Sequence, residues 1–314
     1  MSASANPHHF IDISDFDADE IMEIASLAEE MKEKPEEYKK SLDGKTMCFI
    51  LEKNSTRTRV SFEVAINQLG GNAVILGAGQ TQMGRGEPIS DTAMVLSRYC
   101  DIIVYRANKH EDMIELANHA TVPVVNALTD YSHPCQIIAD VITIKEHFGD
   151  LNNVQITWIG DLNNVLQSFI HVSVLLNIKL NICVPKTLHS QFEQFNKNNA
   201  HHENAKNITL FSNKTESVKG SQVVVSDTWV SMGDDYDKEK VFDGMIVDEE
   251  TMSHAASNAI FMHCMPIYRG KEVSSKVVKN NLSTIINEAE NRLHAQKAIM
   301  LNAITQIARR RRRQ

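Results

Sequence analysis

The chain lacks the features that mark membrane, exported and repetitive proteins. No stretch approaches the roughly 18 consecutive apolar residues of a membrane-spanning helix, so we expect no membrane association. Residues 1–19 are polar and acidic, without the apolar segment of a secretory signal or the arginine-rich character of a transit peptide. Internal repeats are absent, and the one low-complexity tract is the arginine run at 309–313. These absences predict a cytoplasmic location.

Cysteine is scarce and shows no pairing pattern. The chain has 5 cysteines, an odd number, and no C-x-x-C pair. Cys48, Cys100 and Cys183 lie in or beside apolar runs. This pattern favours buried free thiols in a reducing compartment over a disulfide framework or a zinc site.

An excess of positive charge is also missing. Lysine and arginine number 32 against 40 aspartates and glutamates, which gives a net charge of −8 at pH 7. Nucleic acid would repel such a chain, so we expect no nucleic-acid partner. Arg309–Arg313 is the local exception, but like charges at a terminus usually form a solvated tail and are favourable at a helix C-terminus.

What is present indicates a two-domain α/β protein. The 314 residues are enough for two domains of about 150 residues each. Apolar residues switch repeatedly between the period of strands and that of helices. The predicted strands are Thr46–Leu51, Asn72–Leu76, Asp101–Tyr105, Val122–Ala127, Gln155–Ile159, Lys179–Val184, Asn207–Ser212, Gln222–Asp227 and Asn258–His263. The main predicted helices are Thr58–Leu69, Ile89–Arg98, His110–Ala117, Pro134–Phe148 and Thr284–Ile307.

This alternation predicts two doubly wound domains, each with a parallel sheet covered by helices on both faces. The first would span residues 1–148 and the second residues 149–286, hinged near residues 147–153. Residues 308–314 would form a basic tail. Ligands bind beyond the carboxyl ends of strands in such sheets, so the polar residues that follow each strand are the candidates for function.

The first candidate is a phosphate site after the first strand. Ser55-Thr56-Arg57-Thr58-Arg59 brings hydroxyls, helix N-terminal N–H groups and guanidinium together, which suits a phosphate dianion. A Ser/Thr-rich helix cap with solvated arginines is the alternative. Arg106, after another strand, could add a second guanidinium, and His133 would then be a neutral donor to a carbonyl oxygen.

Here the sequence resembles a known family. Ser55–Arg59 and His133-Pro134-Cys135-Gln136-Ile137-Ile138-Ala139-Asp140 are similar to the S-T-R-T-R and H-P-x-Q-x-x-x-D motifs of carbamoyltransferases, and the likeness runs from Gly44 to about Ile304. The resemblance implies that carbamoyl phosphate is bound by the side chains of Ser55, Thr56, Arg57, Thr58, Gln82, Arg106, His133, Gln136 and Arg292.

Two of these residues are implied by the resemblance alone. Gln82, in the Gly-rich loop 77–86, would come from the neighbouring subunit of a homotrimer. Arg292, in Glu288-Ala289-Glu290-Asn291-Arg292, would reach back to carbamoyl phosphate, so that the last helix, about residues 287–307, completes the first domain. An isolated loop glutamine or helix arginine would otherwise be read as solvated.

The amine acceptor is indicated by the second half of the chain. Ser226-Asp227-Thr228-Trp229-Val230-Ser231-Met232-Gly233 resembles the loop by which ornithine-specific members close over their amino acid. By that likeness Asp227 and Ser231 would bind the α-ammonium group, while Asn164 and the Met232 N–H would bind the α-carboxylate. An Asx turn at Asp227 and a helix cap at Asn163-Asn164 are the alternatives.

The last strand is followed by His263-Cys264-Met265-Pro266, which is similar to the H-C-L-P motif of the ornithine enzymes. Aspartate enzymes have H-P-L-P, so Cys264 points to ornithine. Met265 in place of leucine conserves volume and would contribute through its backbone. The resemblance implies that Cys264 and Met265 also contact carbamoyl phosphate; without it, Cys264 would be a buried thiol.

The implied reaction moves the carbamoyl group of carbamoyl phosphate onto the side-chain amine of L-ornithine, giving L-citrulline and phosphate in arginine metabolism. It needs no cofactor and no metal. Arg57, Arg106, His133 and Arg292 would stabilise the developing negative charge. Asp227 and Cys264 would assist deprotonation of the amine.

Other functions remain as alternatives. A carbamoyltransferase for another amine and a non-catalytic binding paralogue both fit the motifs. A dinucleotide-dependent dehydrogenase fits the fold class, but neither Gly160–Asn164 nor the loop 77–86 provides G-x-G-x-x-G.

Overall fold

The computed structural model describes residues 7–230 and 236–313. The chain folds into two compact units. Met1–Ile142 and Asn291–Gln314 form the first unit, and Thr143–Glu290 form the second. Helices α6 (Pro134–Phe148) and α12 (Leu282–Arg313) each begin in one unit and end in the other.

The first unit holds a four-stranded parallel sheet in the order β2-β1-β3-β4. Its strands are β1 (Thr46–Leu51), β2 (Asn72–Leu76), β3 (Ile102–Arg106) and β4 (Val124–Leu128). Its other helices are α1 (Ala18–Glu33), α2 (Pro35–Tyr38), α3 (Thr56–Gln68), α4 (Ile89–Leu96) and α5 (His110–His119). Phe10 forms an isolated parallel bridge with Val125, so the N-terminal segment pairs with β4.

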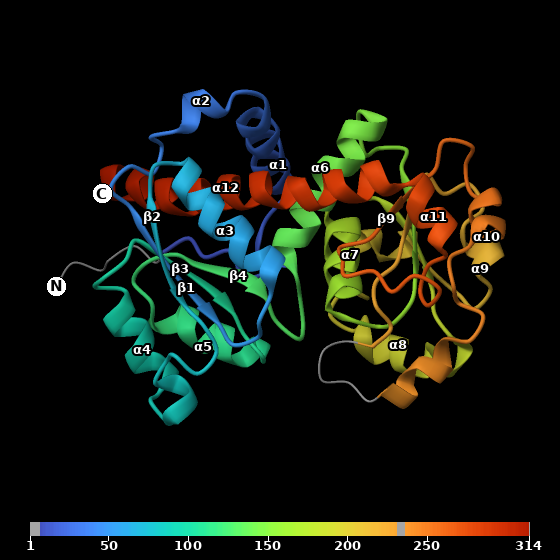
Figure 1. Ribbon diagram of the computed structural model, residues 1–314, viewed down its shortest axis with the longest axis horizontal. Coiled ribbons are helices and arrows are strands. Elements are labelled where there is room, and N and C mark those ends of the chain that lie inside the picture. Colours follow the sequence, from blue (N-terminus) through green and yellow to red (C-terminus); the bar gives the residue numbers. More distant parts are fainter. Residues whose placement is uncertain (1–6, 231–235, 314) are drawn as a thin grey trace. The chain divides into compact units, whose positions relative to one another are not determined.

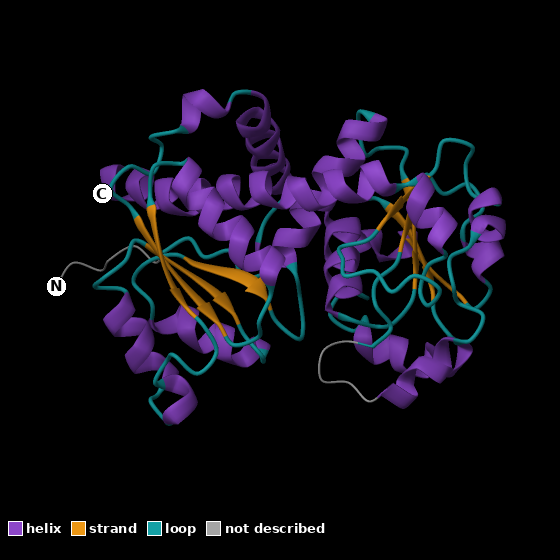
Figure 2. Ribbon diagram, viewed as in Figure 1, coloured by secondary structure: helices purple, strands orange, loops and turns teal. Residues whose placement is uncertain are grey.

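Alternating side chains of this sheet enter two different cores. Helices α3 and α12 lie on one face, and α4 and α5 lie on the other (Figures 1 and 2). Phe49 packs against Phe62 of α3, with ring centroids 5.2 Å apart. Tyr105 belongs to the opposite core with Met113 and Leu116 of α5. This is the period-2 alternation expected of a sheet that is buried on both faces.

The second unit holds a five-stranded parallel sheet in the order β7-β6-β5-β8-β9. Its strands are β5 (Gln155–Ile159), β6 (Lys179–Cys183), β7 (Ile208–Phe211), β8 (Val223–Val225) and β9 (Ile260–Met262). Its other helices are α7 (Asn164–Leu175), α8 (His189–Phe195), α9 (Lys214–Ser217), α10 (Glu249–Ser253) and α11 (Ser275–Asn280).

Both sheets are doubly wound, which confirms the predicted fold class. In the first, the chain winds outward from β1 to β2 and then returns to start β3 on the other side. In the second, the same reversal occurs between β5 and β8. These two reversals are topological switch points, where loops diverge at the carboxyl ends of the strands and leave room for a ligand.

The predicted elements exist, but several boundaries were wrong. Strand β3 begins one residue later than predicted: the Asp101 N–H donates to the Thr46 carbonyl, but the Thr46 N–H is taken by the Asp101 carboxylate, which also accepts the Lys45 ammonium. Arg106 is therefore the last residue of β3, not the residue after it. Helix α12 continues to Arg313, beyond the predicted end at Ile307.

Two predictions from composition can be compared with the structure. All five cysteines are free, and Cys48, Cys100 and Cys183 are buried as predicted. Within the described part of the chain, no helix is long and apolar enough to cross a membrane.

Candidate active site

The phosphate loop of the first unit joins β1 to α3. Ser55 is the N-cap of α3, and its Oγ accepts the backbone N–H of Thr58 at 3.4 Å. The Ser55 hydroxyl also donates to Thr58 Oγ1 at 3.0 Å. Thr56 is exposed and Arg57 is half-buried. The predicted cap is therefore present, at the same helix N-terminus where the anion site is predicted.

Two arginines from distant parts of the chain meet at Thr58. Arg106 Nη1 donates to Thr58 Oγ1 at 3.3 Å, and Arg292 Nη2 donates to the same oxygen at 2.8 Å. Both guanidinium groups are buried. Two buried cations that converge on one neutral hydroxyl form a strongly positive environment at the switch point of the first sheet, which favours a dianion.

His133 completes this positive region as a neutral group. Burial lowers the pKa of its imidazole well below the ordinary value, and the neighbouring positive charges of Arg292 and Arg106 lower that pKa further. The ring is therefore uncharged at neutral pH and can donate a hydrogen bond without adding a third positive charge. Gln136, buried one helical turn along α6, donates from Nε2 to Asp140 Oδ1 at 2.8 Å.

Gln82 stands apart from these residues. It is exposed and precedes a short 3-10 helix, Met83–Arg85. Among the described residues, its side chain forms no hydrogen bond. The structure therefore places Gln82 in the predicted loop but does not bring it to the other predicted phosphate ligands of the same chain.

The second candidate region lies at the switch point of the second sheet. Asp227, just after β8, is buried; its Oδ2 accepts Asn163 Nδ2 at 2.9 Å and its Oδ1 accepts the Cys264 thiol at 3.3 Å. Asn163 also caps α7, because its Oδ1 accepts the N–H groups of Val165 and Leu166. Asn163 was predicted as a cap, and it also orients the Asp227 carboxylate. Asn164 is the half-buried first residue of α7.

The segment after Asp227 begins in the core. Trp229 is buried and stacks on Phe242, with ring centroids 5.4 Å apart and an interplanar angle of 13°. Ser231 and Met232, the other predicted ornithine ligands, lie outside the described residues.

The loop that presents Cys264 is held by two glutamates that the sequence analysis missed. The His263 N–H donates to Glu288 Oε2 at 2.8 Å, and His263 Nε2 lies 3.3 Å from Glu272 Oε1. His263 Nδ1 accepts the Met265 N–H at 2.9 Å. Met265 has a positive φ of 61°. These contacts fix the backbone on both sides of Cys264.

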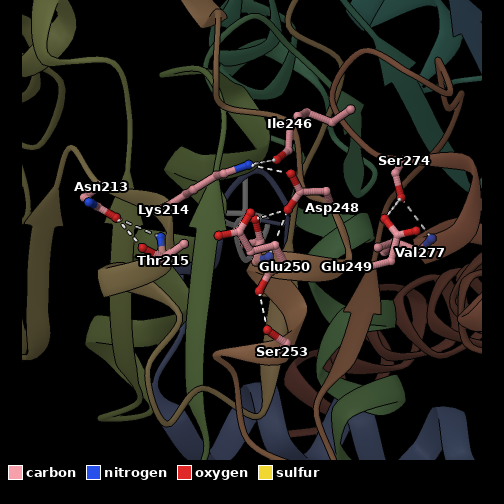
Figure 3. A network of polar contacts seen from close by, with 11 residues as sticks. Asn213, Lys214, Thr215, Ile246, Asp248, Glu249, Glu250, Ser253, Ser274 and Val277 are labelled. Carbon is pink, nitrogen blue, oxygen red and sulfur yellow. Dashed lines mark hydrogen bonds and ion pairs between the residues drawn. The ribbon is translucent and has the colours of Figure 1, made fainter.

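A further polar network surrounds Lys214 and Asp248 (Figure 3), and Val247, the residue before Asp248, connects this network to Glu272. Val247 donates its N–H to the Glu272 carbonyl at 2.9 Å. Lys214 Nζ donates to the Ile246 carbonyl at 2.6 Å and to Asp248 Oδ2 at 2.9 Å. Asp248 Oδ1 in turn caps α10 by accepting the Thr251 N–H at 2.9 Å. The two residues that flank Val247 are therefore both tied to one half-buried lysine.

Asp227, His263 and Cys264 also bring three potential metal-ligand atoms within 4.8 Å of one another. The sequence had offered only the His263-Cys264 pair. The Met265 N–H already donates to His263 Nδ1, and the Asp227 carboxylate already accepts the Cys264 thiol and the Asn163 amide. We therefore assign no metal to this cluster.

Comparison with known proteins agrees with this geometry. The model of the carbamoyl phosphate-binding domain of aspartate/ornithine carbamoyltransferases matches residues 8–146, and that of their Asp/Orn-binding domain matches residues 152–303. The chain belongs to the aspartate/ornithine carbamoyltransferase family.

Relatives within the family span nearly the whole chain. The ornithine carbamoyltransferase of Rhodopseudomonas palustris is 44% identical over 98% of this chain and 100% of its own length. That of Campylobacter curvus is 45% identical over 93% and 97%. The crystal structure of the anabolic ornithine carbamoyltransferase of Campylobacter jejuni has a TM-score of 0.88 at 40% identity and covers 95% of this chain and 99% of its own.

The structure thus groups the predicted carbamoyltransferase residues into two sets. Ser55, Thr58, Arg106 and Arg292 are connected through hydrogen bonds in the first unit, with His133 close to both arginines. Asp227 and Cys264 are connected in the second. Glu272 lies only nine residues after His263, and Glu288 belongs to the motif that contains Arg292. Their contacts with His263 could not be predicted, because they depend on how α12 and a loop return to β9.

Proposed function

We propose that this protein is an ornithine carbamoyltransferase, which converts carbamoyl phosphate and L-ornithine to L-citrulline and phosphate. The observation that carries the proposal is the Asp227–Cys264 pair, with the thiol 3.3 Å from the carboxylate at the strand ends of the second unit. A carboxylate beside a thiol suits an amine acceptor. The names of the relatives, which align along almost the whole chain, support the same acceptor.

In the first half of the reaction scheme, the first unit binds carbamoyl phosphate. Ser55, Thr56 and Thr58 hold the phosphate with the helix N-terminus, and Arg57, Arg106 and Arg292 neutralise its charge. His133 and Gln136 contact the carbamoyl group. As the amine attacks the carbamoyl carbon, negative charge grows on the carbonyl oxygen and on the departing phosphate, and these same groups stabilise it.

In the second half, the second unit binds the amino acid. Asp227 and Ser231 hold the α-ammonium group, while Asn164 and the Met232 N–H hold the α-carboxylate. Cys264 and the backbone of Met265 contact the carbamoyl group. The side-chain amine must lose a proton before its lone pair can attack, and Asp227 with Cys264 assists that loss.

The direct test is to measure product formation with three acceptors. We expect citrulline from ornithine with carbamoyl phosphate, and at least about a hundredfold lower turnover with aspartate or putrescine, whose charged groups do not match the site. Equal turnover with putrescine would assign a different acceptor. Substrate binding without product would instead support a non-catalytic paralogue.

We further propose that the protein is a homotrimer with shared active sites. Gln82 follows β2, the edge strand of the first sheet. Exposed apolar side chains gather on the elements next to it: Val60 and Val64 on α3, Val74 on β2, and Met94 and Val95 on α4. Exposed edges and apolar patches of this kind are usually covered by a partner. A second copy seated there would explain why Gln82 is remote from the phosphate ligands of its own chain.

Subunit mixing tests this assembly. Arg57→Ala and Gln82→Ala should each lose activity, and refolding the two variants together should restore it. With random equal mixing, about a quarter of the sites would receive both native residues if Gln82 acts across a symmetric interface. Verified hybrid trimers without recovery would mean that both residues act within one subunit.

We also place the reaction in arginine biosynthesis and in the cytoplasm. Citrulline is a precursor of arginine, and free thiols are typical of a reducing compartment. Arginine auxotrophy after deletion of the gene, relieved by citrulline, would support the biosynthetic direction; growth without arginine would contradict it.

A further inference from the structure

Glu52 occupies a position that the proposed mechanism does not use. It is the first residue after β1 and precedes the phosphate loop by only Lys53 and Asn54. Its carboxylate accepts two hydrogen bonds: from the Tyr105 hydroxyl to Oε1 at 2.7 Å, and from the Asn108 backbone N–H to Oε2 at 2.6 Å. Its own N–H donates to the Arg106 carbonyl at 3.0 Å. Glu52 is therefore hydrogen-bonded to the residue before Arg106, to Arg106 itself and to the second residue after it.

These contacts matter because the pairing of β3 with β4 is irregular at Arg106. Between β3 and β4 the register shifts at Tyr105 and Arg106, so that Tyr105 pairs with Asn126 but Arg106 pairs with Leu128. Such an irregularity re-aims side chains and weakens the local ladder. Toward β1 the register is regular, with Leu51 opposite Arg106, and Glu52 extends that pairing by one residue.

The negative charge of Glu52, close to the predicted phosphate site, indicates that its role is structural and not electrostatic. A carboxylate close to a phosphate site repels the ligand, so a purely electrostatic role would weaken binding. The Tyr105 side chain is fully buried, and burial, then the hydrogen bond to Glu52, raises the pKa of its hydroxyl. The phenol thus remains a donor over the whole working pH range. The Glu52 carboxylate, bonded at once to the Tyr105 hydroxyl and the Asn108 N–H, therefore connects the end of β1 rigidly to the end of β3.

We propose that Glu52 is a positioning residue that sets the distance between the Ser55–Thr58 loop and the Arg106 guanidinium, and so controls affinity for the phosphate group. The inference rests on the proposed function only for the identity of the natural ligand. Glu52 touches no reacting atom in this scheme; it acts through the backbone of Arg106 and through the first residues of the loop.

The test compares variants in their affinity for inorganic phosphate, measured by calorimetry. Glu52→Ala removes both contacts and should weaken phosphate binding about tenfold to a hundredfold, as misplaced binding groups commonly do. Glu52→Gln can keep both contacts, because its carbonyl accepts the Asn108 N–H and its amide donates to the Tyr105 oxygen. We therefore expect this variant to bind inorganic phosphate within about threefold of wild type. Glu111→Ala, an exposed glutamate of α5, is the matched charge control.

Kinetics separates positioning from general loss of structure. Glu52→Ala should raise KM for carbamoyl phosphate more than it lowers kcat, with KM for ornithine unchanged. A lower unfolding midpoint with wild-type phosphate affinity would overturn the proposal. If Glu52→Ala does not fold, Tyr105→Phe should still weaken phosphate binding more than Glu52→Gln does, and equal affinity of both with wild type would overturn it.

These outcomes are distinct from failure of the proposed function. A wild-type protein that binds phosphate but makes no citrulline would refute the function, while the affinities of the Glu52 variants would still decide the positioning role. Conversely, a wild-type protein that makes citrulline, with Glu52→Ala binding phosphate normally, would refute only the role of Glu52.

Discussion

The two units use one topology to make binding regions of opposite charge. In the first, buried Arg106 and Arg292 converge on the Thr58 hydroxyl at the switch point between β1 and β3. In the second, the buried carboxylate of Asp227 is held by a neutral amide and a thiol at the switch point between β5 and β8. The comparison teaches that one topology can place two candidate sites at equivalent positions, while a few strand-end residues set the sign of the charge there.

The largest effect should come from neutralising the carboxylate of the second unit. Asp227→Asn keeps the size of the side chain but removes the counter-charge for an ammonium group. We expect turnover with ornithine to fall by two or more orders of magnitude, by about the 2.7 kcal/mol or more that such a loss represents. Calorimetry should show carbamoyl phosphate binding within about threefold of wild type, since its charged partners lie in the first unit.

The opposite pattern of binding would break the comparison. If Asp227→Asn lost affinity for carbamoyl phosphate while ornithine turnover stayed normal, the assignment of one substrate charge to each unit would be wrong.

The next effect tests the cationic side. Arg292→Gln can still donate to Thr58 Oγ1 but loses the positive charge. A hydrogen bond to a charged group contributes about 1.5–3 kcal/mol, so we expect carbamoyl phosphate to bind about 10- to 150-fold more weakly. Ornithine analogues should bind the variant as they bind wild type. Arg98→Gln, an exposed arginine of the first unit outside the Gln82 loop, serves as the control, and an equal loss there would point to long-range attraction instead of contact.

The same comparison shows how far sequence alone could reach. The alternation of strands and helices predicted both sheets, because each strand is a short apolar run and several helices begin at a side-chain cap, such as Asp17 with Glu20 on α1. The ends of strands were less certain, as at Asp101, because side-chain acceptors compete with the sheet ladder there.

The local half of each site could be predicted and the distant half could not. Ser55 and Thr58 are neighbours in sequence, so their capping contact follows from the motif. Glu272 near His263 and Lys214 beside Asp248 join residues far apart in the chain. Such contacts depend on tertiary packing, which no local pattern encodes; Arg292 was found only through resemblance to a family.

A smaller effect concerns the stability contributed by Asp248, in the polar network next to the Glu272 backbone of the second unit. Asp248 is partly buried, which raises the pKa of its carboxyl, but hydrogen bonds from Thr251 and the Lys214 ammonium outweigh burial and lower that pKa overall. Asp248→Asn can keep the cap on α10 but loses the charge that faces the Lys214 ammonium, so it should destabilise the fold by about 1 kcal/mol or less at pH 7. The carboxylate is stabilising above its unfolded pKa of about 4, and the advantage is lost as pH falls through the lower folded value.

Urea unfolding of Asp248→Asn and wild type at pH 7 and pH 3 measures this dependence. The difference between the two proteins should shrink at the lower pH. A difference of equal size at both pH values would mean that Asp248 stabilises the fold by shape and hydrogen bonding, without its charge.

The smallest effect concerns His9, a second histidine of the first unit, besides His133, whose pKa is lowered in the folded chain. His9 Nδ1 accepts the N–H of Val124 at 3.1 Å where the N-terminal segment meets β4. Burial, and then the neighbouring charge of His8, lower the pKa of His9 to about 4. Protonation would turn the acceptor into a donor that faces another donor, so the folded chain resists it.

The unfolded chain, in contrast, takes up this proton below about pH 6.5, and stability falls as pH drops from there toward the folded value. This window lies above that of Asp248, so the two units should respond to different ranges of acidity. His9→Gln retains an acceptor for Val124 but cannot titrate; it should remove a loss of less than about 1 kcal/mol between pH 8 and pH 6. Exchange of the Val124 amide proton, followed at both pH values, reports on this contact directly. His119→Gln, at an exposed position on α5, is the control. If it flattened the pH dependence of stability as much as His9→Gln does, that dependence would belong to histidines in general and not to the contact between His9 and Val124.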